Sequence, residues 1–269
     1  MRRTGAVIGL PQGYCRICGL ERELTEDHVP PKRGGNVGSV VVTCGGHQIW
    51  SQNGIYFRTI CLDCNSQVLG LEADKEYTRV FKEAEGYARY LSVYPKGTID
   101  VRVNGHLLLK SVLGHLLAAS VPDNDVDSLK KPLDYSPFFE TIRQFVIGQG
   151  TLSDRVSCNY WFYGSEVTRL NQYFLNSPDF INHPKLHVMG STFKAYPFGF
   201  WIVDLKASTI APHGFMTLPD NPNVVLKLNV QNQRYEIFPE APTDTGVVLT
   251  SGNSAIVGKK RSTKRTAPT

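Results

Sequence analysis

The sequence predicts an α+β protein in which a small cysteine-rich module precedes a larger domain. Two C-x-x-C pairs lie in the first 70 residues, helical periodicity begins near residue 71, and short apolar runs between turns dominate after residue 154. We therefore expect residues 1–75 to form the module and residues 76–250 an α+β domain, with helices followed by an antiparallel sheet. Residues 251–269 lack periodicity and are interpreted as a disordered basic tail.

Composition and charge limit the class of protein. The chain has 269 residues, of which 41% are hydrophobic, enough for a sizeable core. No apolar run approaches the roughly 20 residues that span a bilayer, and the stretch before Pro11 is too short for a signal peptide, so we expect a cytoplasmic protein with no membrane segment. The net charge is +5, and the last 19 residues carry five Lys/Arg and no acid. A nucleic-acid partner would therefore meet a local patch rather than an overall positive field.

The first helix and strand of the larger domain follow from apolar spacing. Residues 72–94 place apolar side chains close to a 3.6-residue period, which predicts an amphipathic helix, and Pro95 ends it. Residues 98–104 alternate apolar and polar side chains, as a half-buried strand does. Asn104-Gly105 then marks a turn.

Two further helices are predicted. Residues 106–120 are apolar on most sides, which indicates a buried helix. Its two histidines, His106 and His115, are interpreted as core or interface residues rather than ligands. The third helix begins at Pro137, with Ser136 as its N-cap.

The remainder of the larger domain reads as strands. Its β-branched and aromatic runs are separated by turn clusters, as in an antiparallel sheet. The aromatic run Tyr160–Tyr163 is interpreted as a strand with one buried face rather than as a base-stacking platform. The runs are residues 155–163, 185–190, 198–205, 223–230 and 234–238.

The cysteine spacing predicts a metal site. Two C-x-x-C turns can offer four thiolates to one tetrahedral zinc ion, although the 42 residues between the pairs exceed the spacing of a compact zinc ribbon. Cys44 and His47 form a competing C-x-x-H pair, which stays open as an alternative. Ligand softness and the paired spacing favour the four-cysteine set. Its members are Cys15, Cys18, Cys61 and Cys64.

The order of these motifs resembles the HNH endonuclease family in its zinc-stapled form. The residues that carry the resemblance are the first C-x-x-C pair, the stretch "DHVPPK" that begins at Asp27, and "CLDCNSQVLG", in which Asn65 follows the second pair. Together they cover about residues 12–75. The resemblance implies a ββα-metal fold, in which zinc ties a hairpin to a helix. His28 would end the first strand or begin the turn of a hairpin, and Asn65 would begin the helix.

The resemblance also implies a role for each polar residue. Asp27 and Asn65 would be the oxygen ligands of a catalytic Mg²⁺ or Mn²⁺ ion. His28 would be the general base, since a histidine with a pKa near about 6.5 is neutral in the cell and can take a proton from the attacking water. Lys32 and Arg33 would hold the scissile phosphate or a neighbouring one.

Two features depart from the family pattern. The middle asparagine of the HNH motif has no clear counterpart, and Asn36 and Asn53 are both candidates. Residues 36–57 are longer than the usual connection and are interpreted as an extended hairpin. Simpler roles also stay open, because Asp27 is suited to a turn and Asn65 to a helix N-cap.

We therefore expect a metal-dependent HNH-type endonuclease that hydrolyses phosphodiester bonds of nucleic acid, with double-stranded DNA as the expected substrate. Structural Zn²⁺ and catalytic Mg²⁺ or Mn²⁺ would be its cofactors. The C-terminal domain would position DNA, recognise a regulatory partner or form a homo-oligomer, and family analogy suggests defence or a mobile element. The alternative is a non-catalytic zinc module that binds nucleic acid or protein. Asn65 beside Cys64 favours the nuclease, because a zinc staple does not require it.

Overall fold

The computed structural model describes the chain in twelve stretches, and the architecture within them is mixed α+β, as the sequence predicts. None of the helices in these stretches combines the length and apolar character that crossing a membrane requires. The described residues are 7–32, 36, 38–44, 47–91, 97–120, 126–152, 154–165, 167–176, 185–212, 215–230, 249–250 and 255–260.

A small sheet forms the N-terminal part of the molecule. Strand β3 ends at His28 and pairs antiparallel with β6, which ends at Cys61 and leads directly into the helical segment that follows. The predicted position of His28 at the end of a strand is therefore observed. The four strands lie in the order β1 (Val7–Gly9), β6 (Tyr56–Cys61), β3 (Glu21–His28) and β2 (Gln12–Tyr14).

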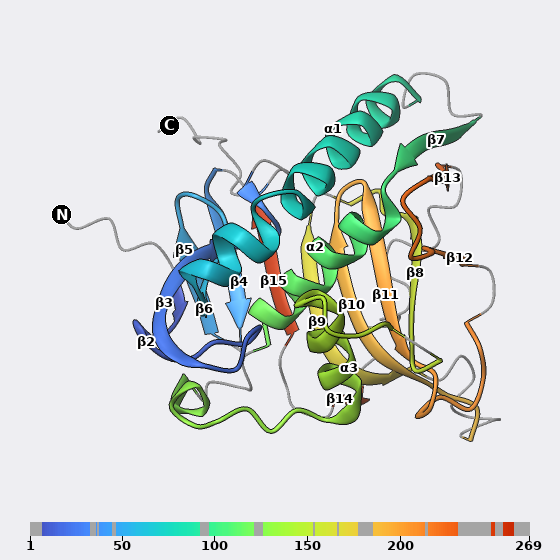
Figure 1. The fold of residues 1–269 in the computed structure, drawn as a ribbon. Helices are drawn as coiled ribbons and strands as arrows, with labels where there is room; N and C mark the ends of the chain where they lie inside the picture. The colour runs from blue at the N-terminus through green and yellow to red at the C-terminus, as the bar shows by residue number, and fades with distance from the viewer. Residues whose placement is uncertain are drawn as a thin grey trace, which may run out of the picture.

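Within the described residues, a nine-stranded sheet lies beside the small one (Figure 1). Strands β4 and β5 form the hairpin that the sequence suggests within residues 36–57, with Val40 opposite Ser51. Strand β14 (Leu249–Thr250) pairs with β9 at its side. The other strands lie in the order β12 (Met216–Thr217), β8 (Val156–Phe162), β11 (Phe198–Asp204), β10 (Val188–Ala195), β9 (Thr168–Asn176), β15 (Ala255–Lys260), β4 (Val40–Cys44) and β5 (His47–Ser51).

The helices confirm the predicted periodic segments. Asn104 caps α2, since its side chain accepts a hydrogen bond from Leu107 N at 3.2 Å. Ser136 occupies the N-cap position of α3 with Pro137 in the first turn, although the Ser136 hydroxyl makes no capping bond. The helical segments are the π-helical η2 (Cys64–Leu69), α1 (Ala73–Leu91), α2 (Gly105–Ala118), the 3-10 segment η3 (Val126–Lys130) and α3 (Pro137–Val146).

Helix α1 packs its apolar face on the large sheet. Its Tyr77 ring lies 6.4 Å from Phe193 of β10, and its Phe81 ring lies 4.9 Å from Phe198 of β11. Figure 1 shows α2 in front of this sheet and α1 running past its upper end. The opposite face of α1 therefore points away from the core.

One hydrophobic core joins the two segments that the sequence suggests as separate domains. The buried cluster that contains Cys15 and Ile17 continues without a break through α2 and α3 to Leu226 and Leu228. Strands β4 and β5, from the first 75 residues, lie in the same sheet as β8 to β11. The N-terminal part is thus packed on the rest of the chain.

The structure corrects the expectation of a disordered tail for part of residues 251–269. Residues 255–260 form β15, which pairs antiparallel with both β4 and β9. The sequence gives little sign of this strand, because it is short and its partners are far away in the chain. Residues 251–254 and 261–269 of the predicted tail lie outside the described residues.

Two details of the predicted sheet also change. The run within residues 223–230 forms β13 (Val224–Asn229), but it pairs with β7 (Thr98–Val103) in a separate two-stranded sheet. Strand β9 was not predicted, since its polar residues obscure the alternation. The predicted strand at residues 234–238 lies outside the described residues.

Candidate functional site

Four cysteine side chains gather where β6 meets η2. Their Sγ atoms all lie within 4.8 Å of one another, and the sulfurs of Cys18 and Cys61 are 3.9 Å apart. A tetrahedral ion with Zn–S bonds of about 2.3 Å holds its sulfurs about 3.8 Å apart, so the cluster fits zinc. These four residues could bind a metal such as zinc, and within the described residues no other His/Cys/Asp/Glu group has such spacing. The members are Cys15, Cys18, Cys61 and Cys64.

Hydrogen bonds and crowding set the charge of these thiols. The backbone N–H groups of Cys61 and Ile17 donate to Cys15 Sγ at 3.3 and 3.5 Å. A hydrogen bond from the Cys64 thiol, helped by backbone donors, lowers the pKa of Cys15 to about 5 despite its burial. Burial and the neighbouring thiols raise the pKa of Cys18 to about 11. A second thiolate is therefore costly here unless a cation is bound, which favours a metal centre.

Strand β3 carries two of the predicted site residues at its last two positions. Asp27 is paired with Phe57 and His28 with Tyr56 in the register of β3 against β6. A register shift between Thr25 and Glu26 interrupts the ladder just before them. Asp27 is only 6% exposed, yet both Asp27 and His28 line the same cleft.

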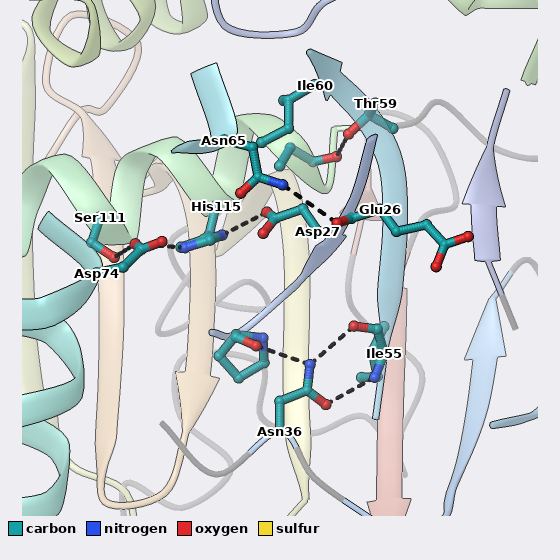
Figure 2. Close-up of polar contacts among 12 residues, drawn as sticks. Glu26, Asp27, Asn36, Ile55, Thr59, Ile60, Asn65, Asp74, Ser111 and His115 are labelled. Atoms are coloured by element: carbon teal, nitrogen blue, oxygen red, sulfur yellow. Dashed lines mark hydrogen bonds and ion pairs between the residues drawn. The ribbon is translucent and has the colours of Figure 1, made fainter. Parts of the chain in front are cut away.

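Asn65 reaches β3 from η2. Its Nδ2 donates hydrogen bonds to Thr25 Oγ1 at 3.2 Å and to the Glu26 carbonyl at 3.3 Å. Figure 2 shows the amide nitrogen turned toward Glu26 and the amide oxygen on the side of Asp27. Both donor bonds fix the orientation of the amide, and its Oδ1 has no partner among the described residues. This oxygen is therefore available to a ligand in the cleft.

Gly70 is the last residue of the "CLDCNSQVLG" motif, and the backbone around it requires a glycine. Its N–H donates to the Asn65 carbonyl at 2.9 Å, which closes a π-helical turn. A Cβ atom at position 70 would lie 2.9 Å from the carbonyl oxygens of both Asn65 and Ser66, a closer contact than side chains normally make. Glycine thus lets the π-helical turn that begins at Asn65 close at this position.

His28 is half-buried at the end of β3. Its ring lies 4.0 Å from that of Tyr56, and its Nε2 is shielded from solvent with no hydrogen-bond partner among the described residues. Burial lowers the pKa of His28, and the nearby Lys32 adds to this effect. The charge of Asp27 and a hydrogen bond to the backbone of Asn53 oppose it. His28 is therefore neutral at neutral pH.

Helix α2 adds a residue to the site, His115, which the sequence analysis interprets only as a core or interface residue. His115 is fully buried, as expected, but its Nδ1 lies 3.0 Å from Asp27 Oδ2 and its Nε2 lies 3.0 Å from Asp74 Oδ1. Ser111 Oγ also donates to Asp74 Oδ1 at 2.7 Å. Figure 2 shows these four side chains in one row. Because α2 is apolar on most sides, the sequence pattern does not indicate this contact.

A glycine lets α2 come close enough for this contact. A Cβ atom at Gly114 would lie 2.4 Å from Leu69 Cδ2 of η2. The close approach of the two helical segments brings the next residue, His115, between β3 and α1. In the sequence, the glycine inside this apolar helix is the one feature that indicates close packing against a neighbouring segment.

The two carboxylates keep His115 charged. Burial alone would lower its pKa, but the charges of Asp27 and Asp74 and their hydrogen bonds outweigh burial and raise the pKa of His115 to about 10. The positive charge of His115 and two hydrogen bonds, in turn, outweigh burial and lower the pKa of Asp74. Both carboxylates therefore face a fixed positive charge on their inner side.

A cleft of about 530 Å³ opens over these residues. One wall comes from β3 and the turn after it, and another comes from α1. Its acidic and polar residues include Glu26, Asp27, His28, Asn65 and Asp74, and its cations are Lys32, Lys75, Arg79 and Lys82. Carboxylate and amide oxygens at the floor and cations at the rim suit a ligand that carries phosphate and binds a divalent cation.

The structure thus brings together most of the predicted site residues. Asp27, His28, Asn65 and Lys32 line one cleft, whereas Arg33 and the side chains of Cys44 and His47 lie outside the described residues. Of the two candidates for the middle asparagine, Asn53 contacts the His28 ring through its backbone. Asn36 instead ties Pro30 to Ile55, with Nδ2 donating to both carbonyls at 2.9 Å.

Comparisons of the chain with protein-family models, with curated proteins and with solved structures found no match. The assignment to a class of protein therefore rests on the residues and geometry described above.

Proposed function

We propose that this protein is a metal-dependent HNH-type endonuclease that hydrolyses phosphodiester bonds of nucleic acid. The observation that carries the proposal is the meeting of Asp27, His28 and Asn65 in one cleft, although they come from different elements. An acid, a neutral base and an amide oxygen are the residue types that this reaction uses. Double-stranded DNA is the proposed substrate.

Asp27 and Asn65 fit a site for a hard divalent cation. One oxygen of Asp27 accepts from His115, and the other has no partner among the described residues, as is also true of Asn65 Oδ1. Mg²⁺ or Mn²⁺ bound there would neutralise negative charge on the leaving oxygen. His115 braces the back of Asp27, as histidine–carboxylate pairs do behind metal ligands.

His28 is proposed as the general base. Its lowered pKa keeps the ring neutral, and the bond to the Asn53 backbone accounts for one ring nitrogen. The other nitrogen, Nε2, is buried and has no partner among the described residues. A buried unpaired nitrogen costs stability, which a structural role does not explain. Nε2 is closed to solvent in this structure, so it would take the proton of a water that attacks phosphorus after the ring turns toward the cleft that His28 lines.

The four-cysteine cluster is proposed to hold structural zinc. Two of its members lie beside β2 and β3, and two flank the junction of β6 with η2. A closed tetrahedral site would fix Asn65, which directly follows Cys64, against β3. Zinc would thus hold the shape of the cleft without taking part in the chemistry.

The test is plasmid cleavage by the full chain with Mg²⁺, with Mn²⁺ or with EDTA. We compare wild type with His28→Ala and Asp27→Asn across a titration of each metal, and measure zinc in every sample. His28→Ala should lower the cleavage rate by about 10²–10⁴-fold, because a general base contributes that much. Asp27→Asn should need more metal for the same rate, since it removes a charged ligand.

Three outcomes separate the nuclease from the alternative, a zinc module that binds nucleic acid or protein without cutting. Cleavage that needs metal and His28 supports the nuclease. Wild-type protein that binds DNA but never cuts it under any of these metals favours the binding module. Undiminished cleavage by His28→Ala, with zinc retained, refutes the proposed mechanism.

A further inference from the structure

The outward face of α1 carries a row of polar side chains beside the cleft. Lys75, Thr78, Arg79 and Lys82 recur at a spacing of three, four and seven residues, so they share one side of the helix. All four line the cleft of Asp27 and Asn65. The opposite side of α1 is buried against the sheet through residues such as Tyr77 and Phe81.

The cations of this row differ in what they already bind. Arg79 is engaged by Glu76 and Glu83 and also donates to the Arg102 carbonyl at 2.6 Å, so it anchors α1 to β7. Lys75 and Lys82 are exposed and form no ion pair or hydrogen bond with any described residue. Two ammonium groups are therefore available to a ligand, one on each side of Arg79.

The spacing of these lysines suits a phosphate backbone. Seven residues of α-helix rise about 10.5 Å, from about 1.5 Å per residue. One strand of B-form DNA advances about 3.4 Å along the duplex axis per phosphate, so a helix parallel to that axis would place Lys75 and Lys82 about three phosphate steps apart. Lys32, which follows β3, lines the same cleft. A duplex whose axis follows α1 would thus meet cations from two segments of the chain beside Asp27 and Asn65.

We infer that Lys75 and Lys82 form a backbone-binding track that holds the phosphates next to the scissile one along α1. The track rests on the proposed nuclease function and adds to it a binding surface outside the catalytic residues. Lysines contact phosphates as point charges and carry no information about the base sequence. The track therefore binds nucleic acid of any sequence and orients it across Asp27 and Asn65.

The test is equilibrium binding of a short fluorescent DNA duplex with no Mg²⁺ or Mn²⁺ added, so that the catalytic metal is missing and the structural zinc is kept, over a series of salt concentrations. The variant is Lys75→Gln/Lys82→Gln, in which glutamine keeps the helix propensity of lysine. Its affinity should fall by about one to two orders of magnitude near about 0.1 M salt, and its slope of log K against log salt should flatten by about 2. Lys131→Gln, an exposed lysine outside the cleft, is the matched control and should bind as wild type does. An RNA duplex of the same sequence shows which nucleic acid the track prefers.

The outcomes test the phosphate-binding track separately from the nuclease function. Lower affinity and a flatter slope in the double variant alone support the track, whether or not the wild type cuts DNA. Equal affinity and slope in all three proteins refute the track and leave the nuclease to the cleavage assay. Binding that is restored by Lys75→Arg/Lys82→Arg shows that charge, rather than folding, carries the effect.

Discussion

His115 Nδ1 lies 3.0 Å from Asp27 Oδ2, and the His115 side chain has no exposure to solvent. The other ring nitrogen faces Asp74, so the imidazole joins β3 to α1 through α2. Removing one partner of a buried ion pair leaves the remaining charges without compensation, which is strongly destabilising. His115 is therefore expected to support both the fold and the position of Asp27.

The charge of His115 makes stability depend on pH in a defined window. His115→Gln should lower the free energy of unfolding by about 3 kcal/mol near pH 6, because two carboxylates lose a charged partner. The folded-state pKa of about 10 lies above the ordinary value of 6.5, so this stability is fully present below about pH 6.5 and is lost as the pH rises toward 10. Urea unfolding of both proteins across that range measures the difference.

The matched control for this prediction is Ser111→Ala, which removes one neutral hydrogen bond to Asp74. It should cost about 1 kcal/mol and the cost should not change between pH 6.5 and 10. A gap between wild type and His115→Gln that stays constant over the same range contradicts a charged His115.

The sequence predicted the elements and contacts that depend on local pattern. Helix α1 follows from apolar periodicity, and the cysteine cluster follows from two C-x-x-C turns that each place two thiols together. The contact of His115 with Asp27 could not be predicted in this way, because it joins residues 88 positions apart and its helix is apolar on most sides. Strand β15 escaped prediction for the same reason, since its partners are β4 and β9.

Loss of the four-cysteine site should destabilise the whole protein. We expect Cys61→Ser to release the metal and to lower the melting temperature in one transition, because Cys15, Cys61 and Cys64 belong to the same buried cluster as α2 and α3. Structural zinc contributes on the order of 10 kcal/mol to folding in small modules. Metal analysis of the purified protein and calorimetry measure the two effects.

Two control variants locate the metal. Cys158→Ala changes a buried thiol of β8 outside the cluster and should keep the wild-type metal content. His47→Ala should also keep it, if Cys44 and His47 are not ligands. Zinc that persists in Cys15→Ser and disappears in His47→Ala would assign the site to the competing pair instead.

The C-terminal segment should have two separable roles. Strand β15 lies between β9 and β4, so it connects the β4–β5 hairpin to the rest of the large sheet. Deleting residues 252–269 removes this strand and leaves two ladder edges without partners, and we expect a large loss of stability.

Deleting residues 261–269 keeps β15 and removes three of the five terminal cations, Arg261, Lys264 and Arg265. This shorter deletion should leave the melting temperature unchanged and flatten the salt dependence of DNA binding, because cations that contact phosphates release counterions. Thermal unfolding and salt-dependent binding of both truncations measure the two effects. If the shorter deletion binds DNA with the wild-type salt slope, the terminal cations do not contact DNA. If the longer deletion melts as wild type does, β15 does not support the sheet.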